Sequence, residues 1–187
     1  KQYVEPLARD LAAPIFMPLD VSQPGQLEAV FEEITTKWGR LDILVHSIAF
    51  APKADLQGGL LDCTADGFAK AMDISCHSFI RMAKLAAPLM TEGGSMFAMS
   101  YLGANRVVPN YNVMGPVKAA LEAACRYLAY ELGPRGIRAP AAGGRRRHVA
   151  QHHVELPPEK SGGSLDQFKD IHGVHADVSR QADGHGR

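Results

Sequence analysis

The chain has 187 residues, of which 46% are hydrophobic and 21% are charged, a composition ordinary for a globular protein with one sizeable core. Twenty basic side chains balance twenty acidic ones, so the charge gives no indication of a nucleic-acid or membrane partner. The apolar runs are too short to cross a bilayer, and the first ten residues lack the apolar centre of a signal peptide. Cys63, Cys76 and Cys125 show no CxxC spacing, which together with these features predicts a cytoplasmic protein with unpaired thiols.

Helical and strand-like segments alternate up to Arg138. Three short apolar runs have the character of buried strands, at residues 15–21, 41–50 and 95–101. Four segments with apolar residues at helical spacing alternate with them, at residues 1–11, 22–39, 64–92 and 112–133. Ser22 and Thr64 are the expected N-caps of two of these helices. The alternation predicts a doubly wound, parallel α/β sheet of the Rossmann-like kind, incomplete, with helices on both faces.

Ligands of such sheets bind beyond the carboxyl ends of the strands. The polar residues at those ends are Asp20, Ser47 and Tyr101. The segment after Tyr101 carries Tyr111 and Lys118, which lie seven positions apart and would share one face if both belonged to a helix. A lysine close to a phenol favours the phenolate, which would help Tyr111 in acid–base chemistry. From the spacing alone, a half-buried tyrosine and a surface lysine on one helix would be the more common interpretation.

Three stretches change that interpretation: LDILVHSIAFAP, MDISCHSFIRMAK and MSYLGANRVVPNYNVMGPVKAALEAACRYLAYELGPRGIR. Together they resemble bacterial enoyl-acyl-carrier-protein reductases of the short-chain dehydrogenase/reductase superfamily. Most members of the superfamily place the lysine four residues after the tyrosine, where this chain has Gly115. The enoyl reductases instead have six intervening residues, as between Tyr111 and Lys118, and a strand end like that from His46 to Pro52.

The resemblance implies roles for the residues that match. Tyr111 would hydrogen-bond the thioester carbonyl and support the enolate, and Lys118 would hold the nicotinamide ribose. Tyr101 would line the acyl pocket as a second active-site tyrosine. The remaining matches divide into cofactor contacts at Asp20, Val21, Ser47, Ile48 and Ala49, and substrate contacts at Ala51 and Met114.

The reaction that the resemblance implies is the NADH-dependent reduction of the trans-2 double bond of an enoyl thioester in fatty acid biosynthesis. It also implies acyl carrier protein as the partner that presents the substrate, and a homotetramer as the intact assembly. NADPH stays open as the cofactor, because the residues that select between the two follow a strand that is not seen in the sequence.

Two departures from the family pattern define the predicted domains. The family begins with a strand and a glycine-rich turn for the cofactor pyrophosphate, and no such segment is seen, so residues 1–138 are expected to be a partial domain unable by itself to bind NADH tightly or to turn over. Residues 139–187 gain Arg, His, Gly and Pro and lose apolar periodicity, which predicts a divergent, disordered tail and suggests a shifted reading frame. A non-catalytic remnant and a different short-chain dehydrogenase/reductase remain the alternatives.

The histidines are not expected to bind metal. His46 and His77 fall on a predicted strand and helix, where a core or interface role is the more common one. His148, His152 and His153 lack a surrounding framework of carboxylates or cysteines. Accordingly, no metal site is predicted.

Overall fold

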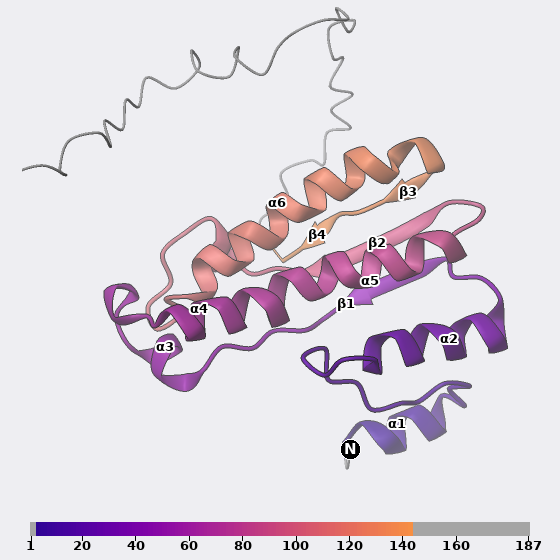
Figure 1. Ribbon diagram of the computed structural model, residues 1–187, viewed down its shortest axis with the longest axis horizontal. Helices are drawn as coiled ribbons and strands as arrows, with labels where there is room; N and C mark the ends of the chain where they lie inside the picture. The colour runs from indigo at the N-terminus through magenta and orange to yellow at the C-terminus, as the bar shows by residue number, and fades with distance from the viewer. Residues whose placement is uncertain (1–2, 144–187) are drawn as a thin grey trace, which may run out of the picture. The chain divides into compact units, whose positions relative to one another are not determined.

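The computed structural model of the chain describes residues 3–143 (Figure 1). The segment 144–187, which holds most of the predicted tail, lies outside the described residues. Within residues 3–143 no helix is both long and apolar enough to cross a membrane.

A parallel sheet forms the centre of the described part of the chain. Its strands are β1 (Ile43–His46), β2 (Gly94–Met99), β3 (Ile137–Arg138) and β4 (Ala141–Ala142). Strand β2 pairs with β1 on one side and with both β3 and β4 on the other, and all of these pairings are parallel. Parallel pairing with helical crossovers is what the alternation of segments predicted, and the fold class is confirmed.

The chain stays in the sheet beyond Arg138. Ala139 is buried, the Pro140 carbonyl accepts a hydrogen bond from the Ala98 backbone N–H at 3.2 Å, and β4 then pairs with the end of β2. Proline has no backbone N–H to donate, so the ladder is interrupted there and β3 and β4 are two pieces of one extended segment. Residues 139–142, which were assigned to the disordered tail, are therefore packed against β2.

Within residues 3–143, six α-helices lie around the sheet. They are α1 (Val4–Asp10), α2 (Gln26–Trp38), α3 (Lys53–Gln57), α4 (Ala65–Met72), α5 (Ser78–Ala86) and α6 (Met114–Leu132). Short 3-10 turns lie at Leu60–Asp62, Ala87–Leu89, Leu102–Ala104 and Gly133–Arg135. A π-helical segment, η2 (Asp73–His77), joins α4 to α5.

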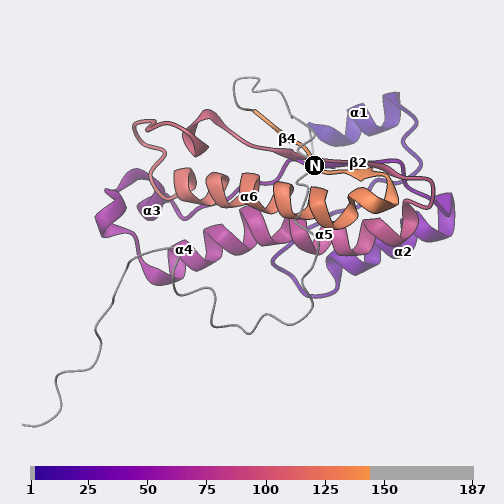
Figure 2. The same ribbon diagram turned by 90° about the horizontal axis from the view of Figure 1, so that it is seen from above.

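The helices are divided unequally between the two faces of the sheet. Helix α5 packs against both α2 and α6, and all three lie on one side of the sheet, whereas α1 lies on the other side (Figure 2). The core fills the space between this helical layer and the strands. Its largest fully buried apolar side chains are Phe79, Met90, Met96, Leu121 and Ile137.

One of the two predicted N-caps is confirmed. The Thr64 hydroxyl accepts a hydrogen bond from the Gly67 N–H at 3.0 Å, as an N-cap should, and Thr64 itself donates to the Asp55 carboxylate. Ser22 is not a cap: α2 begins after Gly25, which has a φ of 81°. The Ser22 hydroxyl and N–H both donate to the Asp20 carboxylate instead.

The strand predicted at residues 15–21 is wrong. A strand requires a neighbour that completes its backbone hydrogen bonds, and no segment among residues 3–143 pairs with this one. Phe16 and Met17 are 44% and 38% exposed, although Val21 at the end of the segment is buried. Strand β1 is likewise buried on one face only, with Ile43 and Val45 more than half exposed.

Candidate active site

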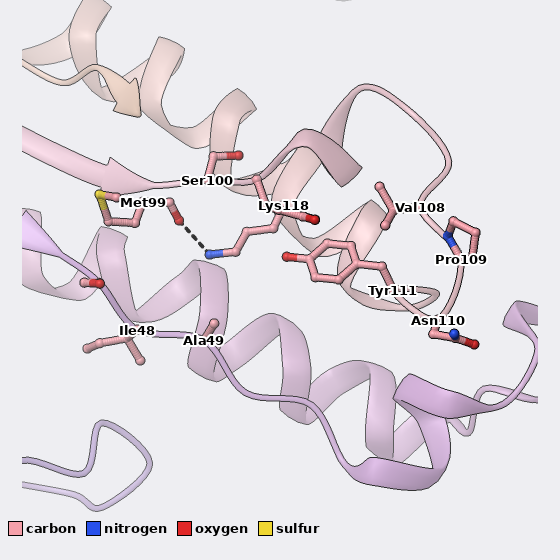
Figure 3. Close-up of a pocket in the computed structure, with 11 residues that line it drawn as sticks. Ile48, Ala49, Met99, Ser100, Val108, Pro109, Asn110, Tyr111 and Lys118 are labelled. Carbon is pink, nitrogen blue, oxygen red and sulfur yellow. Dashed lines mark hydrogen bonds between the residues drawn. The ribbon is translucent and has the colours of Figure 1, made fainter. Parts of the chain in front are cut away.

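A cavity of about 460 Å³ opens beyond the carboxyl ends of β1 and β2. The residues that line it are Ser47, Ile48, Ala49, Met99, Ser100, Tyr101, Val108, Pro109, Asn110, Tyr111 and Lys118. They come from four places: the segment that follows β1, the end of β2 with the residues after it, the loop before α6, and α6 itself (Figure 3). This is the position that the strand-end rule predicts for a ligand site.

Lys118 reaches the cavity from the buried face of α6. Its side chain is only 4% exposed, and its Nζ donates to the Met99 carbonyl at the end of β2 at 2.7 Å (Figure 3). Burial lowers the pKa of Lys118, because removal from water penalises the ammonium form, while the nearby Cys76 and Cys125 oppose that shift. An ammonium group with one donor engaged by backbone retains donors for a second, oxygen-rich partner.

Tyr111 reaches the same cavity by a route that the helical spacing did not predict. Helix α6 begins at Met114, so Tyr111 lies in the turn before the helix and does not share a helical face with Lys118. The two side chains nevertheless line one cavity (Figure 3). Pro116 falls in the first turn of α6, where backbone N–H groups have no intrahelical acceptor, so it is accommodated without loss of a hydrogen bond.

The ionisation of Tyr111 also differs from the expectation. Burial raises its pKa, because the phenolate would be poorly solvated, and the neighbouring Tyr101 raises it further. The expectation that Lys118 would favour the phenolate is therefore wrong for this geometry. Near neutral pH Tyr111 is a protonated phenol, which is a hydrogen-bond donor.

Comparison with known proteins identifies the family. A family model described as enoyl-(acyl carrier protein) reductase matches residues 1–142. The chain belongs to this family. Its match runs through β4, in agreement with the packing of residues 139–142 against β2.

Similar proteins include two curated reductases and one solved structure. The chain is 50% identical over 138 residues to enoyl-acyl-carrier-protein reductase (NADH) 2 of Rhizobium meliloti, covering 74% of the chain and 52% of that relative. It is 45% identical over 172 residues to an enoyl-acyl-carrier-protein reductase (NADH) of Nostoc sp., covering 91% and 64%. An NAD complex of the Anaplasma phagocytophilum reductase superposes with a TM-score of 0.73 at 44% identity, covering 81% of the chain and 58% of that structure.

The chain spans between half and two thirds of the length of these curated relatives. Its sheet and helices match the corresponding part of an enoyl reductase with a bound nicotinamide cofactor.

The cavity does not contain every residue that the resemblance assigned to the site. Asp20 is exposed and bonded to Ser22, and Val21 is buried, and neither lines the cavity. Ala51 packs against the core, and Met114 is buried at the start of α6.

Five lining residues were not predicted: Met99, Ser100, Val108, Pro109 and Asn110. Met99 and Ser100 directly precede Tyr101 at a strand end, so the strand-end rule could have found them. Residues 108–110 belong to a loop whose path follows no sequence period, and Asn110 adopts a positive φ of 61°.

His46 has the core position expected of it, whereas His77 does not belong to the core of residues 3–143. His46 is fully buried, with Nε2 2.7 Å from the Ser78 hydroxyl, and its ring packs against Phe79. His77 is exposed and pairs with Asp73 on the same helical segment. In residues 3–143 no cluster of three or more His, Cys, Asp or Glu side chains is arranged to hold a metal ion.

Proposed function

We propose that the protein to which this sequence belongs reduces the trans-2 double bond of an enoyl thioester, with NADH as the hydride donor. The observation that carries the proposal is the neutral phenol of Tyr111 in one cavity with the buried ammonium of Lys118 and the strand end Ser47–Ala49. The names of the curated relatives, which are NADH-dependent enoyl-acyl-carrier-protein reductases, support the same reaction.

Lys118 fits the role of a ribose-binding residue. It is a buried cation at the wall of the cavity, and within the described part of the chain one of its three donors is bound, by the Met99 carbonyl. Ribose hydroxyls can accept from the donors that remain. Bound NADH would supply the hydride for the β-carbon of the substrate, and Ser47, Ile48 and Ala49 would form the surface beneath it.

Tyr111 fits the role of the residue that stabilises the developing enolate. Because its pKa is raised by burial, it keeps its proton near neutral pH and can donate a hydrogen bond to the thioester oxygen. A donor held in a partly buried site stabilises negative charge as it grows on that oxygen, and this lowers the barrier more than it favours the bound substrate. Tyr101 would form one wall of the pocket for the acyl chain, because its ring packs beside that of Tyr111.

The remaining assignments are part of the same proposal. Asp20 and Val21 would flank the adenine end of the cofactor, and Ala51 and Met114 would contact the acyl group. Acyl carrier protein would present the substrate, and the intact protein would work as a homotetramer in the cytoplasm. NADPH stays open as an alternative cofactor.

A chimera tests the proposal directly. The matched 138-residue segment of the Rhizobium meliloti relative would be replaced by the corresponding segment of this chain, which restores the flanking parts of the domain. We expect the chimera to oxidise NADH in the presence of a short trans-2-enoyl thioester. Activity only with 3-oxoacyl thioesters would indicate a ketoreductase, and a folded chimera without activity would indicate a non-catalytic remnant.

A further inference from the structure

A π-helical segment lies opposite the strand end that borders the cavity. Segment η2 (Asp73–His77) interrupts the helix between α4 and α5 and carries Ser75, which is 0% exposed. Segments of this kind are rare, occur mostly as single turns inside α-helices, and are frequent at functional sites. Such a turn interrupts the regular hydrogen bonds of an α-helix, and the contacts of Ser75 show what this turn holds in place.

Ser75 holds the backbone of Phe50 by two hydrogen bonds. Its hydroxyl accepts from the Phe50 N–H at 2.9 Å and donates to the Phe50 carbonyl at 2.9 Å. One side chain thus satisfies both backbone groups of a single loop residue. The two bonds fix the position and the orientation of that residue, because a single bond would leave it free to rotate.

Phe50 ends a short segment that begins at His46. Its beginning is held by Ser78, the first residue of α5. The Ser78 hydroxyl donates to the Ile74 carbonyl at 2.6 Å, so its oxygen is left to accept from His46 Nε2 at 2.7 Å. His46 ends β1 and Phe50 lies four residues later. The three residues between these attachments, Ser47–Ala49, all line the cavity.

We propose that Ser75 is a positioning residue that holds the strand-end segment 47–49 in place through the backbone of Phe50. The inference rests on the proposed function, since it makes the π-helical turn the support of the surface on which the nicotinamide cofactor would lie. Ser75 does not itself line the cavity and acts only through Phe50. Met114 Sδ, 3.9 Å from the same hydroxyl, connects this support to the start of α6.

The Phe50 amide gives a readout that does not depend on catalysis. In the full chain, Ser75→Ala should remove the acceptor of this N–H and speed its hydrogen exchange by about tenfold or more, as followed by NMR. His77→Ala is the matched control, because His77 belongs to the same π-helical segment but is exposed and has no bond to Phe50. Unchanged exchange of the Phe50 amide in Ser75→Ala would overturn the proposal.

The kinetic consequence is measured in the chimera described above. Ser75→Ala should raise the KM for NADH by about tenfold while kcat at saturating NADH falls by less than about threefold, because Tyr111 stays in place. An equal loss in kcat with an unchanged KM would show a merely structural role for Ser75. If the chimera lacked enoyl reductase activity altogether, the proposed function would fail, and the Phe50 exchange would still decide whether Ser75 holds this segment.

Discussion

The rings of Tyr101 and Tyr111 lie 4.8 Å apart between centroids and are tilted by 56°. The two residues lie near opposite ends of the loop between β2 and α6. Gly103 makes this pair possible. A Cβ atom at position 103 would overlap Cδ1 of Tyr111 and lie 3.5 Å from Cδ1 of Tyr101, so the Tyr111 ring rests against bare backbone. The 3-10 turn Leu102–Ala104 therefore sets the position of the phenol in the cavity.

The first prediction concerns that contact. In the chimera, Gly103→Ala should displace the Tyr111 ring and lower kcat by about tenfold or more, because misplacement of a catalytic group is costly in rate. Gly133→Ala is the control, since nothing lies within 4 Å of a Cβ there and its φ is −53°. That control should leave turnover unchanged and stabilise the protein slightly. Steady-state kinetics on both variants decide the matter, and equal activities would contradict the proposed place of Tyr111.

The second prediction separates the two tyrosines. Tyr111→Phe keeps the ring and removes the donor, so kcat/KM of the chimera for the enoyl thioester should fall by about a hundredfold or more. Tyr101→Phe should cost less than about tenfold, because its proposed role is to bound the acyl chain. NADH binding, measured by calorimetry, should persist in both variants. A larger loss of kcat/KM from Tyr101→Phe than from Tyr111→Phe would show that Tyr101 donates to the enolate and that Tyr111 lines the acyl pocket.

The third prediction is that Lys118 costs stability. Burial lowers the pKa of Lys118 in the folded state below the ordinary 10.5. At pH values between the folded-state pKa and 10.5, the unfolded chain therefore binds more protons than the folded one. The free energy of unfolding therefore rises with pH in that window, and at neutral pH the charged Lys118 is destabilising.

Lys118→Met should then unfold at a temperature no lower than the unmutated chain at pH 7, while the corresponding chimera loses NADH binding. Thermal unfolding followed by circular dichroism measures the first effect, and calorimetry the second. A marked drop in the unfolding temperature would show that the bond to the Met99 carbonyl outweighs the desolvation of the ammonium.

The fourth prediction concerns His46 and acid. Burial, aided by Lys118, lowers the pKa of His46 to about 4 from the ordinary 6.5. Between these values the unfolded state binds a proton that the folded state does not, so stability falls as the pH drops from 6.5 toward 4. The buried Nδ1 has no hydrogen-bond partner among residues 3–143, which adds to the cost of placing a proton there.

His46→Gln should flatten the dependence of the unfolding temperature on pH between 6.5 and 4. His77→Gln is the control, because the His77 side chain is 58% exposed, and it should keep the full decline. Parallel pH profiles for His46→Gln and the unmutated chain would contradict the prediction.

Local patterns determined a large part of this protein. The apolar run at 41–50 contains β1, and the run at 95–101 contains all of β2 but its first residue. Thr64 caps its helix because a hydroxyl that accepts from the first helical turn is a local interaction. The fold class and the family also followed from the sequence. Of the three residues that the strand-end rule indicated, Ser47 and Tyr101 line the cavity, since both follow strands that form, whereas Asp20 does not, since no strand forms before it.

Other features were decided only by the tertiary structure, because each depends on groups distant in the sequence. Residues 15–21 form no strand, since a strand needs a neighbouring segment and apolar content alone does not supply one. Tyr111 lines the same cavity as Lys118 because of the path that the loop before α6 takes. The pKa of Tyr111 rises because packing removes water from the phenol. Ser75 and Phe50, which are joined by hydrogen bonds, lie 25 positions apart in the sequence. No local pattern indicates which backbone groups a buried hydroxyl will bond in the folded chain.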